Sequence, residues 1–329
     1  MKYFLSIIAL LTLSIAHAQY TDIINSNRPG ASVGAYSVGK GVFQVETGLG
    51  YFNNNYKTGV ISVEQSNKIG QLFLRYGFLS ERLEINADLG YTQNKTTISG
   101  GIIGGASTFE VKGFNINTVG LKYMLFQAKT ERETNLRSWK ANQRINWKEF
   151  IPTVSLSAQM HTDLVGEPFK TNEMQFKAGL LLQNNFSSGL VFAGNIFADN
   201  VSDPNKRYFN YIAALTYAIT KKFSVFGEYD GRMYKLQPKE NWGAFGLAYL
   251  FSKDLQVDID ARKLFSPDNN AYYINLGFSW RADMHKESYK IKTSDVEENP
   301  NAKGTDRATR KAAKKAARKN KKASKKKKK

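Results

Sequence analysis

The chain has 329 residues, a formal net charge of +19 and no cysteine, which excludes disulfides, thiolate metal sites and a cysteine nucleophile. It contains 17 Tyr, 21 Phe and only 7 Pro. This composition favours many strands joined by turns over the two soluble domains that the length alone would suggest.

The first 18 residues have the pattern of a cleaved secretory signal peptide. Lys2 supplies the positive charge, Phe4–Ile15 the apolar stretch, and Ala16-His17-Ala18 an A-x-A cleavage box. The apolar stretch is too short to span about 30 Å of hydrocarbon. We therefore expect export, with Gln19 at the mature N-terminus. Because Gln19 is not cysteine, the chain is not expected to be a lipoprotein.

Residues 19–40 carry no strand pattern, and Pro29 fixes the backbone directly after Arg28. Two interpretations remain open for this segment. It is either a periplasmic lead-in or a small plug that folds into the lumen of a barrel. In the second case we expect Arg28 to meet Glu46, Glu228 or Asp230.

Residues 41–280 alternate between apolar and polar side chains with the period of two that is typical of β-strands. The pattern predicts about twelve strands of roughly ten residues, the length of a tilted strand that crosses a bilayer. Aromatic residues at the strand ends match interfacial girdles. The run at residues 190–197 is the least regular, because Val191 and Phe197 break its alternation. We predict an all-β fold, a transmembrane antiparallel β-barrel, over a large soluble β-protein.

The connections alternate between tight turns and longer loops, as in outer-membrane barrels with short periplasmic turns. With an even number of strands, both termini would lie in the periplasm of the bacterial cell. The connection at residues 126–148 breaks this pattern, because it is long and charged where a short turn is expected. The expected tight turns lie at residues 80–82, 186–188, 221–222 and 252–254, and the longer loops at 53–67, 92–108, 161–173, 199–207, 235–240 and 263–270.

The C-terminal residues 281–329 form a Lys-rich periplasmic tail in this interpretation. They hold 19 Lys and Arg against 6 Asp and Glu, a net charge of +13, without a core-forming apolar pattern. We expect the tail to be disordered or partly helical. Peptidoglycan or anionic lipid is a candidate contact, and a solvated tail without a fixed partner is equally compatible. No nucleic-acid partner is expected in the periplasm.

The start of the barrel resembles a known family. Arg28, Pro29 and Gly30 precede a variable stretch, and Gly41, Gln44, Glu46 and Gly48 follow it, although Asn27 stands where the family usually has Asp. This opening resembles the "MetA-pathway of phenol degradation" family of outer-membrane proteins, also labelled "transporter". The resemblance implies a barrel, and it suggests transport of small solutes that include aromatic ones.

The charged residues on the polar face of the strands are the candidate functional residues. They would point into the lumen, where they either line a narrow pore or pair with one another as a closed core. The candidates are Glu46, Arg75, Glu84, Asp88, Lys122, Glu228, Asp230, Arg232, Asp258, Asp260 and Arg262.

No enzyme, cofactor or metal site is expected. The mature chain has two histidines, His161 and His285, and His161 lacks a serine two positions on, the spacing that a barrel hydrolase needs. Two isolated histidines also make no zinc site. The sequence therefore predicts a passive outer-membrane channel or transporter for small solutes. The alternative is a structural barrel whose basic tail tethers it to the cell envelope.

Overall fold

The computed structural model describes residues 23–100, 105–128, 147–171, 174–186, 189–267 and 269–285. The expected signal peptide, the middle of the 126–148 connection and nearly all of the Lys-rich tail lie outside these residues. The chain divides into two compact units, Met1–His285 and Lys286–Lys329. All described residues belong to the first unit.

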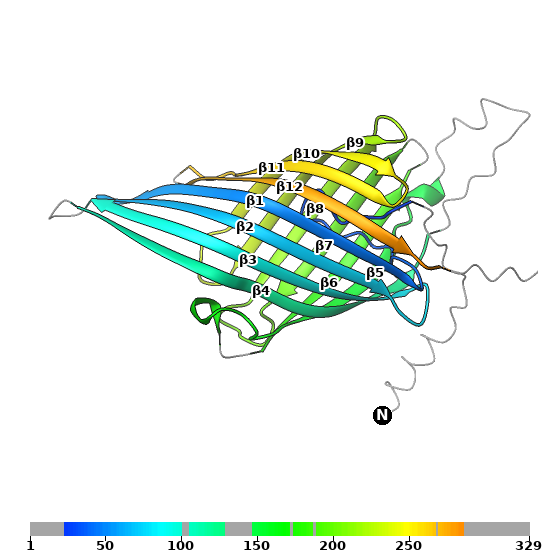
Figure 1. Cartoon of the computed structure of the whole chain (residues 1–329), viewed down its shortest axis with the longest axis horizontal. Coiled ribbons are helices and arrows are strands. Elements are labelled where there is room, and N and C mark those ends of the chain that lie inside the picture. The colour runs from blue at the N-terminus through cyan, green and yellow to red at the C-terminus, as the bar shows by residue number, and fades with distance from the viewer. Residues whose placement is uncertain are drawn as a thin grey trace, which may run out of the picture. The chain divides into compact units, whose positions relative to one another are not determined.

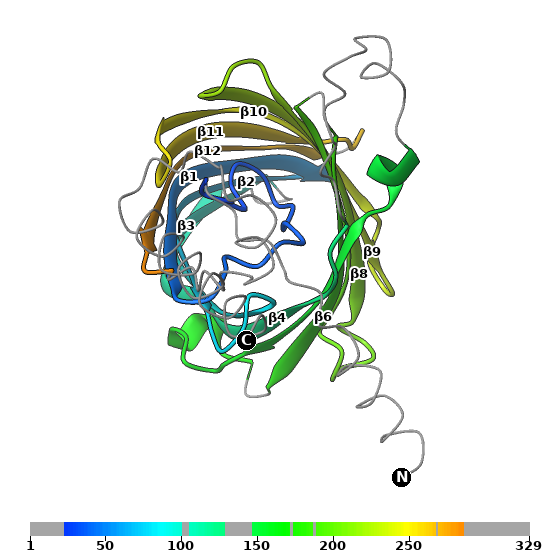
Figure 2. The same cartoon turned by 90° about the vertical axis from the view of Figure 1, so that its right-hand side faces the viewer.

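Twelve antiparallel strands form a closed barrel (Figures 1 and 2). Each strand pairs with its neighbour in the chain, and β12 pairs with β1 from Val42↔Asp283 to Tyr56↔Asn269, which closes the ring. Where all twelve strands overlap, closure leaves no sheet edge, so the backbone groups there can be paired without water. The predicted fold class is confirmed. The strands are β1 (Val42–Thr58), β2 (Ile61–Gly77), β3 (Leu83–Gly100), β4 (Ala106–Phe126), β5 (Thr153–His161), β6 (Gln175–Asn185), β7 (Leu190–Asp199), β8 (Tyr208–Ala218), β9 (Phe223–Tyr234), β10 (Glu240–Ser252), β11 (Leu255–Leu264) and β12 (Asn269–Asp283).

The wall of the barrel is apolar outside and polar inside. Leu49 and Leu276 are 71% and 54% exposed on the outer face, whereas Gln44 and Arg75 are fully buried inside. A soluble protein places these residue types the other way round. Because successive side chains of a strand point to opposite faces of the sheet, each strand contributes side chains to both the outer and the inner surface of the barrel.

Aromatic residues form two rows on the outer face. Tyr51 lies 6.4 Å from Tyr272 near the loop end of the barrel, measured between ring centroids. Tyr249 lies 4.8 Å from Phe251 near the turn end. Rows at two levels match the girdles that hold a barrel at both membrane interfaces. In the described residues, no helix is long and apolar enough to span a membrane.

The first four strands are much longer than predicted. They have 17, 17, 18 and 21 residues and reach past the others at one end (Figure 1). The expected loops at 53–67 and 92–108 were wrong over most of their length. Residues 53–58, 61–67, 92–100 and 106–108 continue the ladders, for example Tyr56↔Val63. Gly59, with φ of +61°, and Val60 make a two-residue hairpin turn instead. Their Asn- and Lys-rich composition suggested loops, but cross-strand pairing decides the conformation.

Near its end, the connection between β4 and β5 contains a short 3₁₀ helix, η1 (Trp147–Phe150). The Phe150 ring packs edge-on against Phe186 at the end of β6, with centroids 5.4 Å apart. A second 3₁₀ helix, η2 (Glu167–Phe169), lies in the loop between β5 and β6. The last strand continues to Asp283, three residues past the expected end of the barrel.

A charge on the outer belt should destabilise the barrel. We expect Leu276→Arg to lower the free energy of unfolding by about 2–4 kcal/mol, the cost of an arginine near the bilayer midplane. Urea titration of the protein refolded into liposomes measures this change. Leu236→Arg is the matched control, because Leu236 is 74% exposed in the connection between β9 and β10. Equal losses in both variants would contradict the assigned lipid-facing belt.

Candidate functional site

Residues 23–40 lie inside the barrel and are called the lumen segment below (Figure 2). At its start, the N–H of Ile24 donates to the carbonyl of Lys253, in the turn between β10 and β11, at 2.8 Å. At its end, the N–H of Lys40 donates to the carboxylate of Glu81, in the turn between β2 and β3, at 3.0 Å. Both ends of the segment therefore lie at the end of the barrel that carries the short turns, and its middle enters the lumen.

A cluster of ion pairs lies on the inner wall of β1 to β4. Arg75 Nε lies 2.8 Å from a Glu84 carboxylate oxygen, and Arg75 Nη1 lies 3.0 Å from Glu46. Lys122 Nζ lies 3.0 Å from the other oxygen of Glu84. All four side chains are at most 1% exposed. These residues, called the Arg75 cluster below, neutralise one another in a buried site, where an unpaired charge would be costly.

The Arg75 cluster also binds the backbone of the lumen segment. Arg75 Nη1 donates to the carbonyl of Asn25 at 2.7 Å, and Lys122 Nζ donates to that of Tyr36 at 2.9 Å. The N–H of Val38 donates to Glu84 at 3.0 Å. Charge-assisted hydrogen bonds of this kind are roughly twice as strong as neutral ones. These hydrogen bonds hold in place a segment that has no regular secondary structure of its own.

Arg28 lies over the paired glycines Gly48 and Gly277, where a Cβ at either position would overlap its guanidinium group. Its Nη2 lies 3.2 Å from Asp258. The expected partners Glu46, Glu228 and Asp230 were therefore wrong for this side chain. Because these two glycines have no side chains, the guanidinium group fits against β1 and β12. From there it reaches the Asp258 carboxylate on β11 instead.

Glu228 binds the next residues of the segment through their backbone. It accepts hydrogen bonds from the N–H of Ala31 at 2.9 Å and of Ser32 at 2.8 Å. Gly30, at φ of +104°, makes this approach possible, because a side chain there would collide with the Glu228 carboxylate and with Phe226.

Neutral wall residues complete the contacts. The Asn195 amide accepts from the N–H of Val33 at 2.7 Å and donates to its carbonyl at 2.9 Å, as a neighbouring strand would. Ala35 packs on an apolar patch of the inner wall that is formed by Leu181, Phe197 and Ile212. The lumen is therefore not polar all round.

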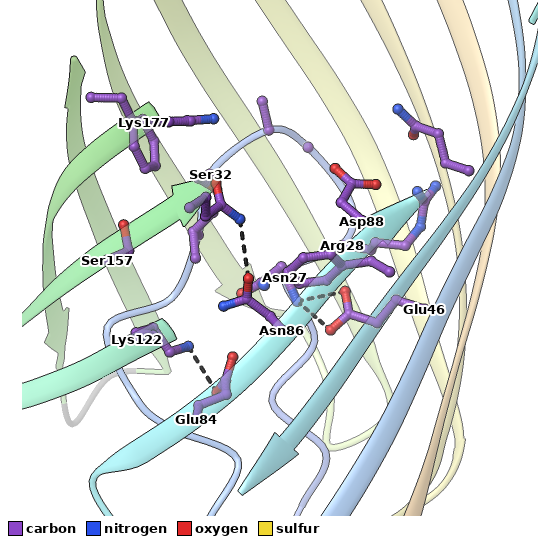
Figure 3. A pocket seen from close by; sticks show the side chains of 17 residues that line it. Asn27, Arg28, Ser32, Glu46, Glu84, Asn86, Asp88, Lys122, Ser157 and Lys177 are labelled. Atoms are coloured by element: carbon purple, nitrogen blue, oxygen red, sulfur yellow. Dashed lines mark hydrogen bonds and ion pairs between the residues drawn. The ribbon is translucent and has the colours of Figure 1, made fainter. Parts of the chain in front are cut away.

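The remaining candidate residues pair across the inner wall. Arg232 lies 3.3 Å from Asp230 and 3.6 Å from Glu240, near the loop end. Arg262 lies 3.2 Å from Asp260 and 3.7 Å from Glu228. Asp88 instead borders a cavity between the segment and the wall, on the side opposite Lys177 (Figure 3). The candidates thus fall into three ion-pair groups, of which the Arg75 cluster is one, together with the Asp258–Arg28 pair and one cavity residue, Asp88.

The predicted site residues were all charged and did not include the uncharged residues of the site. Gln44, Gln183 and Asn195 are buried inside and bind the backbone of Asn25, Ala35 and Val33. The family motif contains Gln44, but nothing in the alternation separates Gln183 and Asn195 from other neutral residues on the polar face of the strands. In the part of the chain that the structure describes, no three His, Cys, Asp or Glu residues could hold a metal ion together.

The closed ring of strands, the apolar belt and the polar interior define the fold of an outer-membrane β-barrel. The chain belongs to the family described as "Putative MetA-pathway of phenol degradation", whose model matches residues 26–282. This match covers the lumen segment from Ser26 and nearly the whole barrel, and it agrees with the resemblance seen in the sequence.

Among solved structures, an outer membrane channel from Pseudomonas putida F1 is similar at 10% identity and a TM-score of 0.52. The similarity covers 78% of this chain and 99% of the other. The translocator domain of the autotransporter NalP from Neisseria meningitidis is similar at 9% identity and a TM-score of 0.45, covering 85% and 95%. At such identities the likeness to the channel shows the fold alone. No curated protein matches the sequence.

The two halves of the family motif contact each other in the lumen. Gln44 donates to the carbonyl of Asn25 at 3.1 Å, and Glu46 accepts from the N–H of Asn27 at 3.1 Å. Gly48 makes room for Arg28. The spacing of Gln44, Glu46 and Gly48 is that of successive inward positions on one strand, so the motif describes the docking of the segment on β1.

Loss of the central arginine should release the lumen segment. We expect Arg75→Met to lower the free energy of unfolding by about 3–5 kcal/mol, because it leaves buried carboxylates without a partner. It should also expose residues 23–40 to protease in the refolded barrel. Urea titration and limited proteolysis measure the two effects.

Arg232→Met is the matched control, because its side chain is 34% exposed and binds no residue of the segment. Protection of residues 23–40 that is as strong in the Arg75 variant as in this control would show that the cluster does not hold the segment.

Proposed function

We propose that the protein is a passive channel for small solutes in the outer membrane, and that the lumen segment narrows its pore. The observation that carries this proposal is a largely polar lumen inside a closed ring of strands. The lumen is partly filled by a chain segment that is bound through side chains of the wall. Small eight-stranded barrels are filled by their own side chains, whereas sixteen-stranded barrels hold an open aqueous channel. A barrel of twelve strands lies between these two cases, so its lumen has room for the segment in addition to the side chains of the wall.

The contacts of the segment support a removable constriction. Its backbone is held by ion-paired and amide side chains, not by a continuous ladder with a strand. Water in the lumen can replace such contacts one by one, because each is a hydrogen bond to a polar side chain. At its start, the segment is joined to a turn by a single backbone hydrogen bond among the described residues, from Ile24 to Lys253, so few contacts have to break there when the segment leaves.

The proposed orientation puts the short turns in the periplasm and the long β1–β4 hairpins outside the cell. Both termini then lie in the periplasm, because the lumen segment begins and β12 ends at the turn end. Short turns on the periplasmic side are the rule for barrels of this type.

Deletion of residues 19–33 tests the proposal. We expect several-fold higher single-channel conductance in planar lipid, because the deletion removes Arg28 and the contacts of Ala31, Ser32 and Val33 from the lumen. A variant that lacks residues 286–329 is the control and should conduct like the full chain. A folded deletion variant without increased conductance would overturn the role of the segment, and a barrel that never conducts would overturn the channel.

The net charge of +13 in residues 281–329 supports a second role, in which the tail tethers the barrel to peptidoglycan or another anionic layer. We expect the full chain to co-sediment with purified peptidoglycan at low salt and to be released near 1 M salt, because the Debye length falls from about 10 Å at 0.1 M to about 3 Å at 1 M. A variant without residues 286–329 should stay in the supernatant. Equal sedimentation of both forms would exclude the tether.

A further inference from the structure

A cavity of about 210 Å³ lies between the lumen segment and the inner wall of β1 to β7. Its volume is below the roughly 300–1,000 Å³ of pockets for drug-sized ligands, so it has room for one small solute. Figure 3 shows Lys177 and Ser157 on one side, Asp88 and Glu46 on the other, and Asn27 and Ser32 of the segment between them.

Several polar groups around this cavity already have partners. Glu46, Glu84 and Lys122 belong to the Arg75 cluster. Arg28 pairs with Asp258, and Gln159 donates to Asn86. The side chains of Asp88, Gln71, Ser157 and Ser32 border the cavity and make no hydrogen bond or ion pair with any residue within the described ranges. These four side chains are therefore available to a ligand.

Asp88 sets the strongest requirement on a ligand among these four residues, because its carboxylate must receive hydrogen bonds. A carboxylate accepts hydrogen bonds and donates none, and it has about four acceptor positions. A ligand that enters the cavity must therefore supply donors to these positions, because a buried carboxylate left without partners is costly. Two neighbouring hydroxyl groups of one solute can do so as charge-assisted hydrogen bonds.

The other side of the cavity complements such a solute. Lys177 Nζ lies 4.5 Å from the centre of the Phe197 ring and 4.0 Å from Asp199, which fixes an ammonium donor opposite Asp88. Phe73 also lines the cavity and offers an apolar surface. Donors, acceptors and an aromatic ring surround one small volume, and a ring that carries several hydroxyl groups satisfies all three.

An aromatic hydrocarbon or a simple phenol fits less well. It would displace the water from Asp88, Gln71 and Ser157 and return one hydrogen bond at most. Polar groups that are desolvated without new partners oppose binding, and a site with several such groups rejects a ligand that cannot pair with them.

We propose that this cavity is a binding subsite for one uncharged, hydroxyl-rich solute of monosaccharide size, in which the Asp88 carboxylate accepts hydrogen bonds from two neighbouring hydroxyl groups. The proposal rests on the proposed channel function, because it names the class of solute that such a channel takes up. It places the solute beside Asn27 and Ser32, so the segment itself forms part of the subsite.

Binding of D-glucose and of phenol to the refolded full-length protein in detergent tests this subsite without requiring conduction. Titrations followed by saturation-transfer NMR give both dissociation constants. We expect D-glucose to bind, and Asp88→Ala to weaken it at least tenfold, which corresponds to about 1.4 kcal/mol. Gln71→Ala should weaken it less, because Gln71 offers a neutral partner. Phenol should neither bind tightly nor displace glucose.

Asp203→Asn is the matched control, because this carboxylate lies in the connection between β7 and β8, outside the cavity, and should leave glucose binding unchanged. Heat-modifiable electrophoretic mobility reports whether each variant folds. If Asp88→Ala does not fold, Asp88→Asn and Gln71→Ala decide the result.

Three results would overturn the subsite. Phenol could bind more tightly than glucose, glucose could fail to bind, or the folded Asp88 and Gln71 variants could bind glucose as tightly as the unchanged protein does. A barrel that conducts ions without binding glucose refutes the subsite and leaves the channel intact. A barrel that binds glucose without conducting in planar lipid refutes the channel and supports the subsite.

Discussion

Arg75 lies completely buried inside the barrel between Glu46 and Glu84, with Lys122 on the far side of Glu84. Each of these charges would be costly alone, because all four side chains are buried. Together they are neutral, and their remaining donors face the carbonyls of the lumen segment. The cluster is therefore satisfied only while the segment or water occupies the lumen beside it.

This dependence explains how a segment without helix or strand is held in place. The wall recognises its backbone: Glu228 and Asn195 bind N–H groups, and Asn195 and Lys122 bind carbonyls. Side-chain identity matters at few points of the segment. Arg28 fits only because Gly48 and Gly277 have no side chains. A side chain at position 30 would collide with Glu228, and Ala35 packs on the apolar patch. In the proposed channel, a segment held in this way could leave by exchanging polar contacts for water, without rearrangement of the wall.

The sequence predicted the fold class and the approximate number of strands, because the period of two is a direct consequence of strand geometry and every strand is exposed to lipid on one face. It failed at the ends of β1 to β4, where the strands leave the membrane and the apolar signal on the outer face disappears. Asn53 and Thr96 are as polar as loop residues, and only their pairing partners make them strand.

The site was less predictable than the fold. Alternation identified which charges share a face, but it could not give their partners across the barrel, because these depend on the tilt and register of strands that are distant in sequence. Arg28 therefore received the wrong partners. The irregularity at Phe197 was visible in the sequence, and it marks a place where the wall turns an apolar side chain inward to meet Ala35. In such a barrel, a break in alternation can indicate an internal contact.

The central claim is that the lumen segment is bound inside the barrel through its backbone. Hydrogen exchange of the full chain in lipid bilayers measures this directly. We predict that the amides of Ala31, Ser32, Val33 and Val38, which donate to Glu228, Asn195 and Glu84, exchange orders of magnitude more slowly than the amide of Gln237, an exposed residue in the connection between β9 and β10. Exchange of these four amides as fast as that of Gln237 would contradict binding of the segment through its backbone.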